Sequence, residues 1–172
     1  IVLGFMLLNV AGITAAIFHI LAHAVAKGGA FLAVGAIARE TEGTELKDFK
    51  GIAKKMPLTT AFLLIFGIGL IGLPLTAGFV TKWYLLNAAF EISGGLGLAV
   101  ILTMTVSAVL TLVYIWKIVE VAYMDKGKQK ASDPPYYMSF SMLSFAAATL
   151  YLGIFPSKTL EYIKPIAEEL LI

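Results

Sequence analysis

The sequence has no cysteine and few charged residues, and each shortage excludes a class of protein. Without cysteine, this chain can hold neither a disulfide nor a thiolate-bound metal or iron–sulfur cluster. Charged residues make up 14% of the 172 residues, whereas a soluble domain has about 25%. Hydrophobic residues reach 59%, and the mean hydropathy is +0.89. Because the net charge of +2 is too small to indicate nucleic-acid binding, the composition predicts an integral membrane protein.

Long hydrophobic stretches predict how often the chain crosses the membrane. A spanning helix needs about 20 mostly apolar residues, and four stretches satisfy this, at 13–38, 57–89, 96–119 and 136–155. The N-terminal IVLGFMLLNV reads as the tail of a further hydrophobic helix that starts outside this sequence, so we expect a longer polypeptide. We predict an all-α fold, a polytopic transmembrane helix bundle that forms a single membrane domain over 1–172.

Basic residues in the loops predict the orientation of these spans. The loop 39–56 carries five of them, and the loop after the third span carries Lys126, Lys128 and Lys130, whereas the connection at 90–95 has none. By the positive-inside rule, the two basic loops lie in the cytoplasm and the C-terminus faces outward from the cell membrane. The final segment, 156–172, is amphipathic and suited to the membrane interface.

Three ionisable residues lie on one face of the first span. His19, His23 and Lys27 follow one another at steps of four, which advance about 40° each around a helix, so they form a line about 12 Å long. Ionisable residues inside a membrane usually face a bundle interior or a wet cavity and mark ion or proton paths. Since histidine, and lysine in an apolar site, can both gain and lose protons, the spacing favours a segment of a proton relay.

Other interpretations of this helix stay open. A buried histidine can simply hydrogen-bond a neighbouring helix, and Lys27 can extend its ammonium toward the interface. A zinc site would need a carboxylate or a third histidine, which this helix lacks, so we predict no metal site. Gly28, Gly29 and Gly35 predict close packing against neighbouring helices.

The second span is too long for one straight crossing and is interrupted by GLPLTAGF at 72–79. Proline removes a backbone donor and clashes with the preceding turn, so we predict a helix break near Pro74, with Gly72 and Gly78 on either side. Irregular backbone at membrane depth is tolerated only inside protein or beside a wet cavity, and such breaks build ion sites in transporters. The sequence therefore predicts a discontinuous helix with a polar environment.

Lys82 follows the break by two turns. A lysine at that depth either faces the same internal polar axis as Lys27 or lies at the interface beside Trp83 and Tyr84, and the spacing alone does not separate the two.

Hydroxyl side chains follow one face of the third span. Thr103, Ser107 and Thr111 are four residues apart, with Tyr114 near the same face. They either line a chain of water molecules or hydrogen-bond a neighbouring helix.

Two motifs together resemble the antiporter-like subunit family. That family comprises the large proton-translocating subunits of respiratory complex I, their counterparts in membrane-bound hydrogenases, and the large subunits of Mrp-type sodium/proton antiporters. Its first motif, His-x-x-x-His-x-x-x-Lys, reads HILAHAVAK here, and its discontinuous helix, with Gly-x-Pro, then Gly-Phe and a lysine, reads GLPLTAGFVTK. The resemblance covers nearly the whole chain but only the C-terminal part of a fold of about fourteen helices.

The resemblance implies proton movement through protonation and deprotonation of Lys27 and Lys82, bridged by His19, His23 and water. It implies a subunit of a redox-driven complex of the complex I or hydrogenase type, with other membrane subunits as partners. No cofactor and no redox chemistry are expected in this chain. A stand-alone Mrp-type antiporter subunit, with sodium as a second ion, and a scaffold that moves no ions are the alternatives. The retained histidines and lysines speak against the scaffold.

Overall fold

The computed structural model describes residues 1–92, 95–124, 127 and 131–172, and within them the chain forms helices and no strands. The elements are α1 (Val2–Met6), α2 (Val10–Thr41), η1 (Leu46–Phe49), η2 (Ile52–Lys54), α3 (Pro57–Ile71), α4 (Ala77–Phe90), α5 (Gly95–Tyr123), α6 (Tyr136–Ile154) and α7 (Pro156–Glu169). The described part is therefore all-α, as predicted.

Three helices, α2, α5 and α6, are each long and apolar enough to cross a membrane. The helices α3 and α4 have 15 and 14 residues, so each is about 21–23 Å long and falls short of a hydrocarbon core of about 30 Å. They flank the segment 72–76, which contains Pro74. The predictions of a multi-pass helix bundle and of a discontinuous helix are confirmed.

The break has a local cause on each side of Pro74. Gly72 ends α3 in the left-handed region, with φ of 81°, and its N–H and that of Leu73 both donate to the carbonyl of Ile68. A residue without a side chain adopts this conformation most readily. Leu75 also has a positive φ, of 73°, before α4 begins at Ala77. Two left-handed residues around a proline prevent α3 from continuing into α4.

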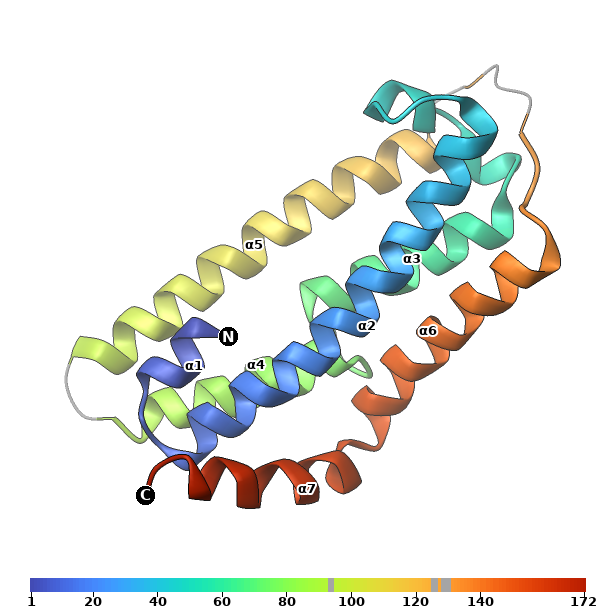
Figure 1. The fold of residues 1–172 in the computed structure, drawn as a ribbon. Helices are drawn as coiled ribbons and strands as arrows, with labels where there is room; N and C mark the ends of the chain where they lie inside the picture. Colours follow the sequence, from blue (N-terminus) through green and yellow to red (C-terminus); the bar gives the residue numbers. More distant parts are fainter. Residues whose placement is uncertain (93–94, 125–126, 128–130) are drawn as a thin grey trace.

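The long helix α2 runs through the centre of the bundle and contacts α1, α3, α4, α6 and α7 (Figure 1). Its contacts are close because the facing residues are small. A Cβ at Gly29 would lie 2.3 Å from the Phe66 ring of α3, and one at Gly28 would lie 3.0 Å from Phe145 of α6. The prediction of close packing is confirmed for these two glycines. It is wrong for Gly35, which is exposed and where an added Cβ would meet no atom within 4 Å.

The loop between α2 and α3 is folded, which its charged sequence did not predict. Phe49 of η1, Ile52 of η2 and Met56 before α3 are buried against the end of α2 and against Val121 of α5. The 46–54 segment meets α3 at 115°. This end of the bundle is thus closed by apolar packing beneath a charged surface.

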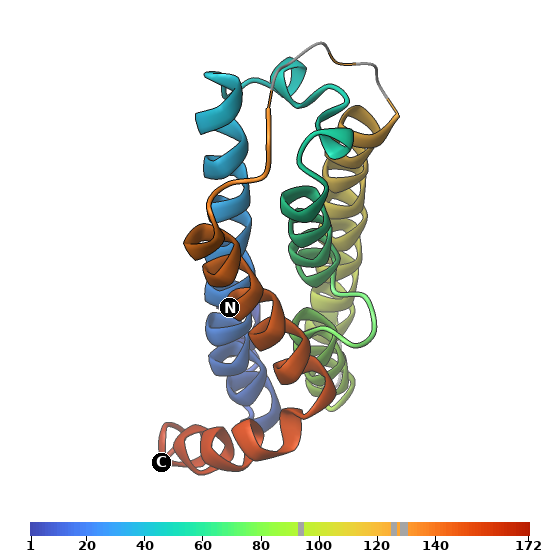
Figure 2. The ribbon, with the colours of Figure 1, turned by 90° about the vertical axis from the view of Figure 1, so that its right-hand side faces the viewer.

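A carboxylate from the α5–α6 connection caps α3. Asp133 accepts hydrogen bonds from the backbone N–H of Leu58 and Thr59 and from the Thr59 hydroxyl, at 3.2, 2.9 and 2.7 Å. The first N–H groups of a helix have no partner within it, so the cap satisfies two of them. Residues 131–135 and the 42–56 loop lie at the same end of the bundle (Figure 2). Three lysines used to predict the orientation lie outside the described residues, Lys126, Lys128 and Lys130.

The opposite end is held by Asn9 and by α7. Asn9 accepts a hydrogen bond from the N–H of Gly12 in the first turn of α2, and donates to the Ala88 carbonyl and to the Glu91 carboxylate near the end of α4. The helix α7 lies across this end (Figures 1 and 2), with Leu160 and Ile163 packed in the core. Its polar face is exposed, so α7 is amphipathic, and its position at a membrane interface stays a prediction.

Candidate functional site

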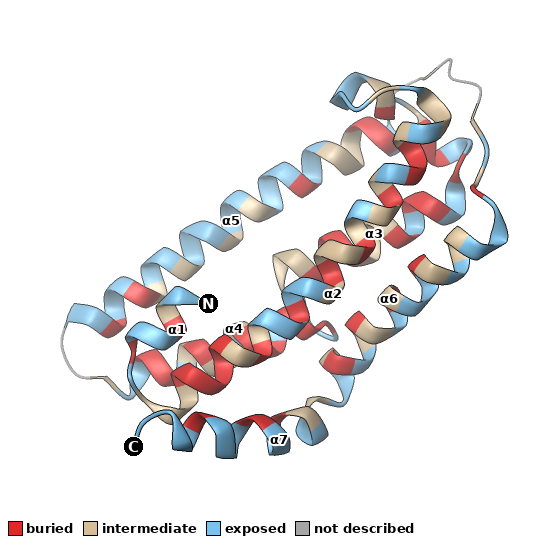
Figure 3. Cartoon of the chain, viewed as in Figure 1, coloured by how far each residue is buried: buried red, intermediate tan, exposed pale blue. Residues whose placement is uncertain are grey.

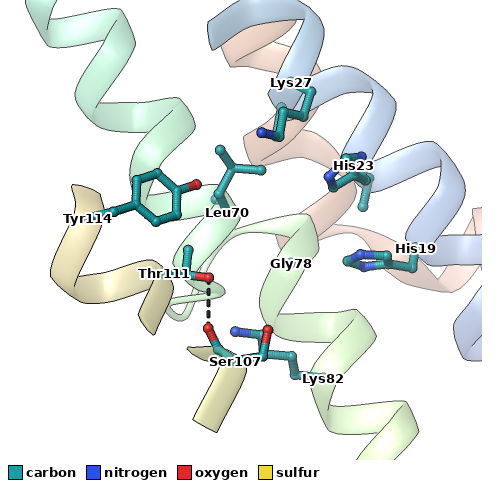
Figure 4. A pocket seen from close by; sticks show the side chains of 12 residues that line it. His19, His23, Lys27, Leu70, Gly78, Lys82, Ser107, Thr111 and Tyr114 are labelled. Carbon is teal, nitrogen blue, oxygen red and sulfur yellow. Dashed lines mark hydrogen bonds between the residues drawn. The ribbon is translucent and has the colours of Figure 1, made fainter. Parts of the chain in front are cut away.

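A cavity of about 280 Å³ opens beside the helix break, and the four ionisable residues singled out from the sequence line it (Figure 4). The residues that line it come from α2, α3, α4 and α5: His19, Ala22, His23, Ala26, Lys27, Gly69, Leu70, Gly78, Lys82, Ser107, Thr111 and Tyr114. Residues separated by more than fifty positions in the sequence therefore share one polar space. Their functional roles remain predictions that the geometry itself does not test.

The first helix presents its ionisable residues as one line. The rings of His19 and His23 have centroids 5.5 Å apart and are tilted by 40°. Lys27 continues the line, with Nζ 5.7 Å from the centre of the Phe31 ring, a distance at which an ammonium is attracted by the ring face. Within the described residues, the Nδ1 atom of His19 is buried without a hydrogen-bond partner. A buried polar atom of this kind needs a partner from outside the side chains seen here.

Lys82 enters the cavity from α4 and reaches back across the break. Its ammonium donates a hydrogen bond to the carbonyl of Ile71, the last residue of α3. A positive charge is favoured there because the C-terminal end of a helix carries a partial negative charge. The neighbouring Trp83 is 53% exposed and stacks on Phe79 instead. Lys82 thus lines the same cavity as Lys27, and its depth in the membrane stays a prediction.

Glycines make room for this arrangement. A Cβ at Gly72 would lie 2.9–3.1 Å from the last three atoms of the Lys82 side chain, and one at Gly78 would lie 2.0 Å from the Gly69 carbonyl oxygen. The third is Gly153 of α6, where a Cβ would lie 2.3 Å from the Leu75 carbonyl oxygen. Sequence reasoning missed Gly153, because only the tertiary contact with the break distinguishes it from other small residues of α6.

The hydroxyl residues of α5 divide into two groups. Ser107, Thr111 and Tyr114 line the cavity, whereas Thr103 does not. The hydroxyls of Thr103 and Thr111 each donate to the carbonyl four residues earlier in α5, at 2.8 Å, so they bond their own helix rather than a neighbouring one. A serine or threonine in a helix has this local partner always within reach.

One side of the cavity is open. His23 and Ser107 are exposed, and Tyr114 is 44% exposed. Most of α5 is exposed as well, apart from its two ends and Ile115 (Figure 3). The basic line and the hydroxyls of α5 therefore face each other across a space that the described residues do not fully enclose.

A multi-pass helix bundle with a broken helix beside intramembrane ionisable residues is the architecture of membrane ion-transport proteins. Comparison with known proteins gives the particular group. The chain belongs to the family described as NADH:quinone oxidoreductase/Mrp antiporter, transmembrane, whose model matches residues 1–111. This confirms the resemblance inferred from the two motifs.

One relative and two solved structures are similar to this chain. The chain is 42% identical over 124 residues to NADH-quinone oxidoreductase subunit N of Desulforudis audaxviator, covering 72% of this chain and 24% of the relative. Its fold is similar to a chain of the Mrp complex from Dietzia sp. DQ12-45-1b, with a TM-score of 0.87 and 23% identity over 98% of this chain and 39% of that one. It is also similar to a chain of an archaeal membrane-bound sulfane sulfur reductase, with a TM-score of 0.81 and 27% identity over 94% of this chain and 32% of that one. The chain thus spans only a quarter to two fifths of these proteins.

Proposed function

We propose that the chain is the proton-translocating part of a membrane subunit in a redox-driven, multisubunit ion pump. The observation that carries the proposal is the convergence of His19, His23, Lys27 and Lys82 on one polar cavity at the helix break. The 42% identity to a quinone oxidoreductase subunit supports the redox-driven type of complex. Other membrane subunits of that complex would be its partners.

The geometry supports a stepwise transfer. Lys27 and Lys82 would change protonation state, and His23 and His19 would carry the proton between them with the help of water. In each transfer one nitrogen loses a proton and the next gains it, so the net charge of the cavity is conserved until a proton enters or leaves. Two ammonium groups in one cavity repel each other. A charge change at one end of the path would therefore move the proton at the other.

Lys82 would alternate between two stabilised states. Protonated, it donates to the carbonyl end of α3, as observed with Ile71. Deprotonated, it loses the attraction of that helix end and can accept a proton from the direction of His19. No step in this scheme needs a cofactor in this chain, and we propose that it holds none.

The test replaces Lys82 by alanine in the complete subunit within its intact assembly. Inverted membrane vesicles would be energised with the electron donor of the complex, and proton uptake would be followed with a pH-sensitive dye. We expect a sharp loss of proton uptake, while the assembly stays intact by gel filtration. The control is Lys117→Ala, because Lys117 is exposed and pairs with Glu120 outside the cavity. Unaltered uptake in Lys82→Ala would contradict the role of Lys82.

A stand-alone sodium/proton antiporter subunit is the second candidate, favoured by the fold similarity to an Mrp complex. Gentle purification of the native assembly separates the two. Iron–sulfur signals in an electron paramagnetic resonance spectrum, with redox subunits among the partners, would support the redox pump. An assembly of membrane subunits alone, with sodium-dependent proton movement, would support the antiporter.

We propose that the end holding the 42–56 loop is cytoplasmic and that α7 lies on the outer side of the cell membrane. The basic residues of that loop support this by the positive-inside rule. This chain has no cysteine, so single Lys54→Cys and Tyr162→Cys variants, made in the complete subunit after any other cysteine is replaced by serine, can be labelled with an impermeant thiol reagent in whole cells. We expect labelling at 162 and not at 54, and the reverse pattern would overturn the orientation.

A further inference from the structure

The irregular segment 72–76 makes few contacts of its own that could fix its shape. The residues 73–75 are exposed, and Thr76 is buried. Thr76 closes a short turn, because its N–H and its hydroxyl both donate to the Leu73 carbonyl, at 3.3 and 2.7 Å. Lys82 reaches across this segment to the end of α3, so whatever holds the segment in place also decides where the ammonium lies.

The helix α6 packs against both parts of this region. Thr149 of α6 is buried, and its Cγ2 would lie 3.0 Å from a Cβ at Gly69 in the last turn of α3. One turn further along α6, a Cβ at Gly153 would overlap the Leu75 carbonyl oxygen and two backbone atoms of Thr76. Residues four apart lie on the same face of a helix, so one face of α6 contacts the end of α3 and the break together.

The end of α3 and the start of α4 also meet directly. A Cβ at Gly78 would overlap the Gly69 carbonyl oxygen, so the backbones of the two half-helices lie in contact there. Gly78 and Lys82 are four residues apart on α4, and both line the cavity. Because Lys82 lies within the first two turns of α4, a shift of the backbone at Thr76 would be passed on to it.

Of the two partners in this contact, the end of α6 is the better anchored. Just beyond Gly153, α7 packs Leu160 and Ile163 into a buried cluster with Phe18 of α2, which ties this end of α6 to the central helix. The residues 73–75, in contrast, are exposed. An added methyl group at position 153 should therefore move the break rather than α6.

We propose that Gly153 is a positioning residue for Lys82. Because position 153 has no side chain, α6 lies directly against the backbone of 75–76 and holds the two half-helices at the spacing at which the Lys82 ammonium reaches the Ile71 carbonyl. Gly153 does not line the cavity that the described residues form, so it acts on proton transfer only through Lys82. The inference rests on the proposed function for its effect on transport, whereas the effect on the break does not.

The test is Gly153→Ala in the complete subunit within its intact assembly. Proton uptake into inverted vesicles is measured per complex assembled, as judged by gel filtration, and hydrogen–deuterium exchange in 72–82 is followed by mass spectrometry. We expect uptake to fall about tenfold, since a misplacement of about 1 Å can slow a positioned reaction by a factor of about 100. Exchange should become faster in 72–82 and not in 103–115 of α5, because the strain is local. The matched control Gly35→Ala adds the same methyl group where no described atom lies within 4 Å, and should change neither property.

The outcomes separate this inference from the proposed function. Unchanged exchange in 72–82 of Gly153→Ala would overturn the inference, because α6 would then not set the break. Faster exchange with normal uptake would overturn it as well, if Lys82→Ala abolishes uptake. Normal uptake in both variants would instead contradict the proposed function, and with it the transport part of the inference.

A second pair of variants keeps the inference testable if Gly153→Ala does not assemble. In Gly69→Ala the new methyl group would meet Cγ2 of Thr149 at 3.0 Å. Thr149→Ser removes that Cγ2 and keeps the hydroxyl, which donates to the Phe145 carbonyl. We expect Gly69→Ala to slow proton uptake and the added Thr149→Ser to restore most of the rate. A double variant no faster than Gly69→Ala alone would overturn the role of α6.

Discussion

The ammonium of Lys82 in α4 donates a hydrogen bond to the carbonyl of Ile71, the last residue of α3. A side chain of one half-helix therefore caps the C-terminal end of the other. The contact spans the 72–76 break and joins Lys82, a proposed proton carrier, to the irregular backbone. A change in the charge of Lys82 therefore acts first on the end of α3.

The space beside Lys82 depends on Gly72. Gly72→Ala should strain the backbone, because φ is 81°, at a cost of about 1 kcal/mol, and should push the new methyl group into the Lys82 side chain. We expect a lower melting temperature and a marked loss of proton uptake in vesicles. The matched control is Gly35→Ala, which adds the same methyl group in open space and should leave both properties unchanged. Equal effects at the two glycines would contradict this account.

The α2–α3 contact at Gly29 should tolerate no added side chain. A Cβ there would meet the Phe66 ring at 2.3 Å, and overpacking of a core costs about 1–3 kcal/mol. We expect Gly29→Ala to lower the thermal stability of the complete subunit. In a double-mutant cycle, Phe66→Leu should recover part of the loss, because it removes the ring that clashes. Purely additive effects of the two changes would show that the contact is not the cause.

The Asp133 cap should matter for stability from a position remote from the cavity. Asp133→Ala removes three hydrogen bonds at the start of α3 and should cost about 1–2 kcal/mol, the range for a lost helix cap. Asp133→Asn keeps one acceptor oxygen and should cost less. Ser132→Ala, at the exposed neighbour, is the control. Thermal melts of the subunit, followed by circular dichroism, rank the three variants by melting temperature. An Asp133→Ala variant as stable as wild type would show that the cap does not stabilise α3.

Two threonines on α5 should behave differently in transport. Thr111 lines the cavity and Thr103 does not, although both bond their own helix. Thr111→Val removes a hydroxyl from the proposed water path and should slow proton uptake several-fold. Thr103→Val removes the same group elsewhere and should not change the rate. Initial rates of dye quenching in vesicles measure proton uptake in the two variants. A slower rate in Thr103→Val alone would contradict the role given to Thr111.

Local sequence patterns predicted the features that depend on local chemistry. The four-residue spacing placed His19, His23 and Lys27 on one face, and the hydrophobic runs placed the spans. Pro74 predicted the break because a proline in a helix interior removes an N–H donor and clashes with the preceding turn. These features need no knowledge of the neighbouring helices.

The remainder depends on contacts between distant segments. Asp133 lies 74 positions from Thr59, and no local pattern links a loop aspartate to that helix start. The burial of Phe49 under a charged loop and the approach of Gly153 to Leu75 have the same origin. Gly35 and Thr103 show the converse. Each fits a local sequence pattern, but among the described residues Gly35 has no neighbouring helix within contact distance and Thr103 does not reach the cavity.

The three hydrogen bonds of Asn9 have a mechanical consequence. One side chain joins the start of α2 to the end of α4, and these helices carry His19 and Lys82. These hydrogen bonds hold the two helix ends together, so α2 and α4 cannot slide past each other along their axes without breaking them. Opening or closing of the proposed proton path would then involve the break at 72–76 or the largely exposed α5.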